Sequence, residues 1–169
     1  RGPVVLDADA LNVFANEAEQ LGALLGSRAA LLTPHPAEFA RLLSVNINDV
    51  LARRFEIGAE IAARTHASVL LKGVPTVISS PGGARLVSCA GTPVLAAAGS
   101  GDLLSGIAGT LVAQMPTAHE AGACAAWVHG RAGEIAGRGF VRGVTFANFD
   151  LALRRVWNEP LRTPEPPVL

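Results

Sequence analysis

The sequence predicts an α/β fold in which a mostly parallel central sheet carries helices on both faces and includes an antiparallel hairpin. Short apolar runs typical of buried strands alternate with longer segments that have apolar residues at helical spacing. Residues 81–83, Pro-Gly-Gly, separate two further strand-like runs, which is a hairpin signal. The 169 residues suit one domain with a sizeable core.

The composition excludes several function classes. Apolar residues make up 50% of the chain and charged residues 17%, which is typical of a folded globular protein. The formal net charge is zero, so no basic field draws the chain to nucleic acid or to a membrane surface. No apolar run is long enough to span a bilayer, and no signal peptide is recognised. We therefore expect a cytoplasmic protein, with Cys89 and Cys124 as free thiols in its core.

The first part of the chain predicts three strands and two helices. Residues 3–8 form an apolar run typical of a fully buried strand, and a strand of that kind usually lies between others. We expect that a preceding segment of the same domain pairs with it. Residues 29–33 and 68–73 predict the second and third strands, and Pro36 begins a helix that runs to about Leu43. A longer helix over residues 46–64 should have as its solvated face Arg53, Arg54, Glu56, Glu60 and Arg64.

The second part predicts the hairpin and three helices. Its strands are residues 76–79 and 84–88. Helices are expected over about residues 102–114 and 117–136, and a last helix, capped by Asn148 or Asp150, ends at about Trp157. The proline-rich tail that follows should be extended.

Polar side chains follow the first two predicted strands. Asp7, Asp9 and Asn12 come at the end of the first, and His35 follows the second, between two prolines. Ligands of open α/β sheets bind at the carboxyl ends of the strands, so all four are candidates for a site. The alternative is that these residues have only structural roles. Asp9 could cap the next helix, and a lone histidine is often a structural residue whose ring bonds within the protein.

A glycine turn, Gly99-Ser100-Gly101-Asp102, leads into an amphipathic helix. Glycines allow a tight turn, and the free N–H groups and dipole of a helix N-terminus favour an anion. A carboxylate beside a bound phosphate could accept a proton from the attacking group. The alternative is that Asp102 only caps the helix. Lys72 is the only lysine among 14 basic residues, which would fit either a local requirement for a compact ammonium group or chance.

Four blocks of sequence, in this order, resemble the ADP/ATP-dependent NAD(P)H-hydrate dehydratases of the ribokinase-like superfamily. The blocks are residues 6–12 (LDADALN), 33–39 (TPHPAEF), 71–76 (LKGVPT) and 98–102 (AGSGD). Each block is weak alone, and the ordered set is specific. Ser100 departs from the threonine that is usual in that family, and it keeps the hydroxyl group.

The resemblance implies a ribokinase-like fold and a role for each matching residue. Asp102 matches the catalytic aspartate, which takes the proton from the substrate hydroxyl, and His35 matches a second residue that contacts the substrate. Glu38 matches a glutamate that acts near Mg²⁺ through water, and no direct protein ligand of a metal is implied. The nucleotide-binding residues that the resemblance implies are Lys72, Gly73, Val74, Pro75, Thr76, Gly99, Ser100 and Gly101.

The resemblance also implies the reaction and the partners. ADP or ATP, with Mg²⁺, would phosphorylate the ring hydroxyl of hydrated NADH or NADPH, and loss of phosphate would restore the ring double bond. Residues 1–158 would form the C-terminal part of one ribokinase-like domain, with the N-terminal part absent from this chain, and 159–169 its proline-rich tail. An incomplete sheet favours a homo-oligomer.

Two other functions remain open. The first is a kinase of the same superfamily that acts on a vitamin-like alcohol, for which the product would be a stable phosphate ester. The second is a non-catalytic fragment that binds a nucleotide without turnover. A Walker-type NTPase is excluded because the sequence contains no G-x-x-x-x-G-K-[ST] motif.

Overall fold

A five-stranded mixed sheet forms the centre of the computed structural model, which describes residues 2–140 and 142–159. Its strands lie side by side in chain order: β1 (Val4–Leu6), β2 (Ala30–Leu32), β3 (Ser68–Leu71), β4 (Thr76–Ser79) and β5 (Arg85–Ser88). The first three pair in parallel, β4 and β5 pair antiparallel through the expected hairpin, and β3 also pairs antiparallel with β4. The predicted fold class is therefore confirmed, with the parallel pairing confined to the β1–β3 half.

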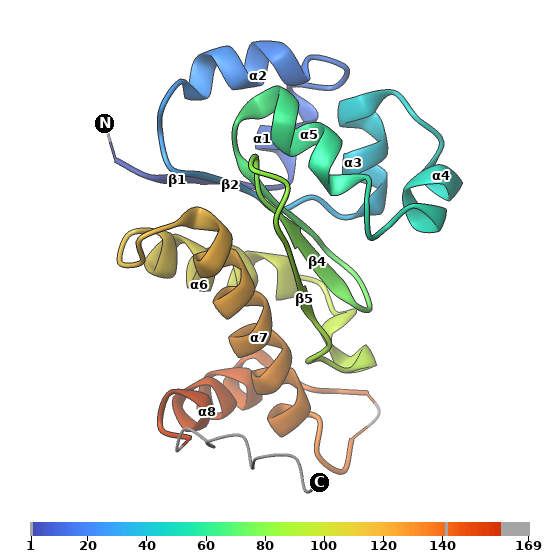
Figure 1. Ribbon diagram of the computed structural model, residues 1–169. Coiled ribbons are helices and arrows are strands. Elements are labelled where there is room, and N and C mark those ends of the chain that lie inside the picture. Colours follow the sequence, from blue (N-terminus) through green and yellow to red (C-terminus); the bar gives the residue numbers. More distant parts are fainter. Residues whose placement is uncertain (1, 141, 160–169) are drawn as a thin grey trace, which may run out of the picture.

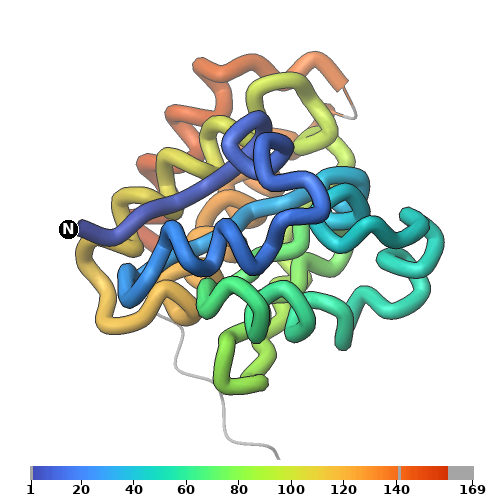
Figure 2. The backbone as a smooth tube through the Cα atoms, turned by 90° about the horizontal axis from the view of Figure 1, so that it is seen from above, coloured from blue at the N-terminus to red at the C-terminus, as the bar shows by residue number. Residues whose placement is uncertain are grey.

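Helices cover both faces of this sheet (Figure 1). One layer contains α1 (Asp9–Asn12), α2 (Ala18–Leu25), α3 (Pro36–Leu43), α4 (Ile47–Ala52) and α5 (Gly58–Thr65). The other contains the short η1 (Pro93–Leu95), α6 (Ser100–Val112), α7 (Ala118–Ala136) and α8 (Phe146–Trp157). Seen from above, the blue-to-green layer overlies the yellow-to-red layer, with the strands between them (Figure 2).

The side chains of the central strands alternate between two cores. Leu31 and Leu70 pack against α6 to α8, whereas Leu32 and Leu71 pack against α1 to α5. All four are at most 1% exposed. Successive residues of a strand point to opposite faces, so a strand covered on both sides must be apolar throughout. This is why β2 and β3 are continuous apolar runs in the sequence.

Strand β1 and the two cysteines differ from the prediction. The side chains of Val4, Val5 and Leu6 are half-buried rather than fully buried, because β1 is the edge strand of the sheet that the structure describes. Cys89 and Cys124 are exposed rather than in the core. Residues 160–169, which hold most of the expected proline-rich tail, lie outside the described residues.

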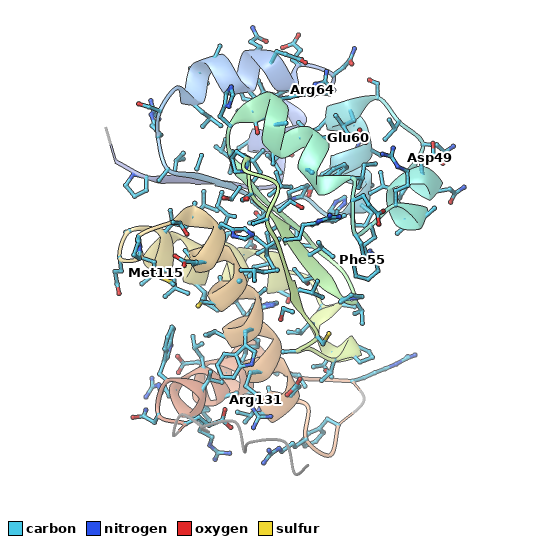
Figure 3. All side chains as sticks on the ribbon, viewed as in Figure 1. Asp49, Phe55, Glu60, Arg64, Met115 and Arg131 are labelled. Atoms are coloured by element: carbon cyan, nitrogen blue, oxygen red, sulfur yellow. The ribbon has the colours of Figure 1, made fainter. Side chains whose placement is uncertain are left out.

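The single helix expected over residues 46–64 is in fact two helices, α4 and α5. Ile47 and Leu51, part of the apolar stripe that suggested one helix, are 42% and 48% exposed. Gly58 begins α5 beside β4, and a Cβ there would meet the Ser79 side chain, so the helix packs closely on the sheet at this point. The predicted solvated face is exposed except at Arg54, which is half-buried. Glu60 and Arg64 can be seen on the outer layer in Figure 3.

Polar side chains mark where several helices begin. Thr117 caps α7, at the residue where the sequence places the start of that helix. Thr145, rather than Asn148 or Asp150, caps α8, because Asn148 closes a reciprocal capping box from the third helical position. Within residues 2–140 and 142–159, none of the helices combines the length and the hydrophobicity needed to cross a bilayer.

Gly22 provides a test of the packing between α2 and α5. A Cβ at Gly22 would lie 2.7 Å from the carbonyl oxygen of Arg64, which is backbone and cannot rotate away. Gly22→Ala should therefore lower the free energy of unfolding by about 1–3 kcal/mol. Gly109→Ala is the control, because a Cβ at Gly109 would meet no neighbouring atom within 4 Å. It should raise the free energy of unfolding by about 0.5–1 kcal/mol. Denaturant unfolding of both variants checks this, and equal effects would contradict the packing.

Candidate active site

The carboxyl ends of the three parallel strands are joined by hydrogen bonds. The backbone N–H of Thr33 donates to Leu6 O at 3.0 Å, and that of Lys72 donates to Pro34 O at 2.9 Å. The Lys72 ammonium then reaches across the sheet, with its Nζ 2.7 Å from Oδ1 of Asp7. The segments that follow β1, β2 and β3 thus meet at one edge of the sheet, where the topology places a ligand site.

Asp7 is held from two sides within this cluster. Its second oxygen accepts a hydrogen bond of 2.7 Å from Oγ of Ser105, on α6. Burial alone would raise the pKa of Asp7, but the hydrogen bonds from Lys72 and Ser105 and the charge of Lys72 together hold it below its ordinary value of 3.8. Asp7 is therefore ionised at neutral pH. The next residue, Ala8, has a left-handed φ of +48°, a strained conformation that is common at functional sites.

The N-terminus of α6 faces the same cluster. A Cβ on Gly101 would lie 3.6 Å from Nζ of Lys72 and 3.8 Å from Oδ2 of Asp7. Gly99, with φ +82°, is the N-cap of the helix, and no side chain caps it. Asp102 is thus in the first turn and is not the cap. Its carboxylate is exposed and makes no hydrogen bond or ion pair within residues 2–140 and 142–159, so it is available to a ligand.

His35 and Glu38 form the reciprocal cap of α3. Nδ1 of His35 accepts the N–H groups of Ala37 and Glu38 at 3.1 and 3.2 Å, so the ring proton is on Nε2, which lies 3.2 Å from Oε1 of Glu38. The other oxygen of Glu38 accepts the His35 N–H at 2.8 Å and is 3.9 Å from Nζ of Lys72. The structural role that the sequence left open for His35 is therefore present. Its side chain is still 46% exposed, so it also remains accessible to a ligand.

A cavity of about 290 Å³ joins the Lys72 segment to the start of α6. It is also lined by residues 90–93, 95 and 96 and by residues of α7, including His129. Of the eight residues expected to bind the nucleotide, six line this cavity and two, Pro75 and Gly99, do not. The six are Lys72, Gly73, Val74, Thr76, Ser100 and Gly101.

Two of the candidates from the sequence lie apart from this cluster. Asn12 donates to Asp9 at 3.4 Å and accepts from Arg41 at 3.0 Å, and all three side chains are at the surface. Asp9 does not cap α1, because Ala8 occupies that position without a side-chain hydrogen bond. Neither residue touches Lys72 or α6 in the hydrogen bonds of the described residues.

Two residues near the cavity had no role in the sequence-based site. Arg54, expected on a solvated face, is half-buried, donates from Nη1 to Pro75 O at 2.6 Å and stands where a side chain on Gly73 would be. His129 is 9% exposed and bonds to Ser100. No local signal marks Arg54. His129 carries no local signal either, since it follows Trp127 and Val128 in the middle of a helix.

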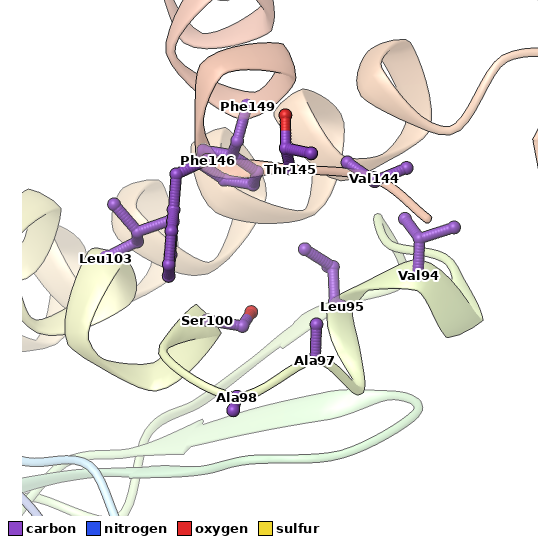
Figure 4. A pocket seen from close by; sticks show the side chains of 10 residues that line it. All are labelled: Val94, Leu95, Ala97, Ala98, Ser100, Leu103, Val144, Thr145, Phe146 and Phe149. Atoms are coloured by element: carbon purple, nitrogen blue, oxygen red, sulfur yellow. The ribbon is translucent and has the colours of Figure 1, made fainter. Parts of the chain in front are cut away.

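A second cavity, of about 310 Å³ and mostly apolar, lies on the other side of Ser100 (Figure 4). The side chains of Leu95 and Ala97 face those of Phe146 and Phe149 across it. The ring of Phe146 also covers the Cα of Gly99, so closely that a Cβ there would overlap it. Leu95 and Ser100 line both cavities, so the segment between them separates the two.

This arrangement can bind an anion beside a free carboxylate. The first amides of α6 and their dipole favour an anion, and the ammonium of Lys72, paired with Asp7, lies beside them. Asp102 stands in the same helical turn and can take a proton from a group that attacks a phosphate bound there. The described residues contain no cluster of three or more His, Cys, Asp or Glu side chains able to hold a metal ion without a ligand's help.

The buried state of His129 should make stability depend on pH. Burial lowers its pKa to about 4 from 6.5, although the bond with the Ser100 backbone opposes the shift, and the charge of Lys72 lowers it further. Between these two values the unfolded chain binds the extra proton, so the free energy of unfolding should fall as the pH falls from about 6.5 to about 4. Chemical denaturation over this range should show a shallower decline for His129→Gln, and an unchanged slope would contradict the buried neutral ring.

Comparison with known proteins points to one family. The sequence profile described as NAD(P)H-hydrate dehydratase matches residues 1–149. An ADP-dependent (S)-NAD(P)H-hydrate dehydratase from Neisseria meningitidis is 45% identical over 133 residues, which cover 79% of this chain and 45% of that protein. The chain therefore spans about half the length of this relative.

Solved structures share the fold. The ADP/ATP-dependent NAD(P)H-hydrate dehydratase from Bacillus subtilis, co-crystallised with ATP/Mg²⁺ and soaked with CoA, superposes with a TM-score of 0.80 at 30% identity, covering 92% of this chain and 56% of that one. A ribokinase-like superfamily protein from Enterococcus faecalis gives a TM-score of 0.69 at 23% identity, covering 92% and 52%. The second likeness shows a ribokinase-like fold.

Proposed function

The chain belongs to the NAD(P)H-hydrate dehydratase family, and we propose that it carries the phosphoryl-transfer centre of such an enzyme. The proposed reaction converts hydrated NADH or NADPH back to NADH or NADPH. ADP or ATP phosphorylates the ring hydroxyl of the hydrate, and elimination of phosphate restores the double bond. The observation that carries the proposal is that the ion pair of Lys72 and Asp7 lies beside Gly101 in the first turn of α6, the turn that also holds the exposed Asp102.

Asp102 would act as the general base. The substrate hydroxyl attacks the terminal phosphorus of the nucleotide, a P–O bond forms to the substrate, and the bond to the leaving ADP or AMP breaks. The hydroxyl proton passes to the carboxylate of Asp102, which makes no hydrogen bond or ion pair to another described residue that would compete for it. We infer that the substrate ring approaches from the exposed side of α6, where His35 is also accessible.

The N-terminus of α6 and Lys72 would stabilise the charge of the transferred phosphoryl group. Their positive charge is fixed before the nucleotide arrives, because Asp7 holds the ammonium in place. Preorganised donors of this kind need not reorient as charge develops in the transition state. The rest of the nucleotide would lie in the adjoining cavity, against Gly73 to Thr76.

The donor set near Lys72 also fits Mg²⁺. This ion takes oxygen ligands and usually binds through one or two carboxylates together with waters and substrate phosphates, so it needs no closed protein site. Glu38, whose side chain is 6% exposed and 3.9 Å from Lys72, would hold it through water. When bound, the ion would neutralise phosphate charge.

The cellular setting and the assembly remain part of the proposal. We infer a cytoplasmic protein, since Cys89 and Cys124 are free thiols, which suit a reducing compartment. Completion of the domain by an N-terminal segment, and association into a homo-oligomer, remain predictions.

Asp102→Asn tests the proposed base. The variant keeps the size of the side chain and cannot accept the proton, so the rate of NADH recovery from its hydrate with ATP and Mg²⁺ should fall roughly 10²–10⁴-fold. The assay follows the return of NADH absorbance in the complete protein. Asp9→Asn is the matched control, because Asp9 is an exposed aspartate outside the cluster, and it should stay within about twofold. A loss of less than about tenfold in Asp102→Asn would refute the assignment.

Arg54→Ala tests the proposed nucleotide segment. Arg54 donates to Pro75 O and lies on Gly73, so its loss should loosen residues 73–76 and raise KM for ATP about tenfold while kcat changes little. Arg53→Ala is the control, because Arg53 pairs with Glu60 at the surface and should leave KM unchanged. Steady-state kinetics separates the two variants, and an equal KM for both would exclude a role for this segment in nucleotide binding.

A further inference from the structure

His129 lies at the centre of α7 and touches the first residue of α6. It is the one histidine that is buried among residues 2–140 and 142–159. Its Nε2 is 3.0 Å from both the carbonyl oxygen and the Oγ of Ser100. A carbonyl oxygen can only accept, so Nε2 carries the proton and donates to Ser100.

The imidazole of His129 is closely packed. The ring of Phe149, on α8, packs against the imidazole with centroids 5.3 Å apart. Gly130, the next residue of α7, lies so close to the backbone of Ala90 that a Cβ could not be fitted. The imidazole therefore has little freedom to move away from Ser100.

The bond to Ser100 acts on the amide that would face the phosphate. The carbonyl of Ser100 and the N–H of Gly101 belong to one planar peptide group and point in opposite directions. A donor that fixes the carbonyl therefore also fixes the direction of the Gly101 N–H. Gly101 lies beside the ion pair of Lys72 and Asp7, since a Cβ on it would be 3.6 Å from Nζ of Lys72.

We propose that His129 is a positioning residue, which orients the first peptide of α6 and thereby aims the Gly101 N–H at the terminal phosphate of the nucleotide. This inference rests on the proposed function. His129 would then belong to the site without touching the reacting atoms. It would act on the transition state through Ser100. His129 also lines the cavity beside Lys72, so its loss would alter the site itself and not a distant part of the core.

The test compares His129→Leu with His129→Gln in the complete protein. Leucine fills the space without a donor, whereas glutamine keeps an N–H near the position of Nε2. We expect kcat to fall about 10- to 10²-fold in His129→Leu, and His129→Gln to stay within about fivefold of wild type. His119→Leu is the matched control, because His119 Nε2 also lies 3.1 Å from a backbone carbonyl, that of Ile78, on the same helix but away from the site.

A binding measurement separates positioning from simple destabilisation. AMP has no terminal phosphate at the helix N-terminus, so calorimetry should show ATP binding weakened about tenfold in His129→Leu and AMP binding within about twofold. If His129→Leu does not unfold cooperatively, it is replaced by His129→Asn in both the kinetic and the calorimetric measurements. The amide of this asparagine is too short to reach Ser100.

Three outcomes would overturn the proposal: an unchanged kcat in His129→Leu, equal losses for ATP and AMP, or an equal loss in the His119 control. Absence of NADH recovery in the wild-type protein would instead refute the proposed function. The comparison of ATP with AMP would still decide the role of His129 in that case.

Discussion

The ion pair between Lys72 and Asp7 organises the candidate site. It links the ends of β1 and β3 across the sheet, and Ser105 ties the same carboxylate to α6. Because both charged groups are mostly buried, each needs the other: loss of one would leave an unpaired charge in the interior. The first turn of α6, the Glu38 carboxylate and the cavity wall are all arranged around this pair. The position of the proposed anion site therefore depends on this one ion pair.

The sequence predicted the architecture well where burial on both faces leaves a continuous apolar run. The strands from Ala30 to Ser79 are of this kind, and the Pro81–Gly83 turn identified the hairpin. It failed where local periodicity does not reveal packing. The stripe from Ile47 to Ile61 fits one helix, but the close approach of Gly58 to Ser79 divides it, and that contact is not visible in a local window.

The candidate site shows the same division. The glycine turn, Lys72 and His35 could be found because each stands where a strand ends or a helix begins, and their order in the chain resembles one family. Arg54 and His129 could not be found in this way, since they reach the site from the middle of other segments. Ser105 bonds to Asp7 although 98 positions separate the two in the sequence, so only the folded structure reveals this contact. Roles that depend on such pairs are visible only after the fold is known.

The contact between Phe146 and Gly99 has an evolutionary consequence. Position 99 is restricted twice, by its left-handed φ of +82° and by the aromatic ring that covers its Cα. A smaller residue at 146 would relieve only the second restriction, so glycine should persist at 99 even in descendants that lose the aromatic ring. The reverse does not hold, and residue 146 is free to drift. Among relatives, position 99 should therefore remain glycine, whereas position 146, at the start of α8, should vary.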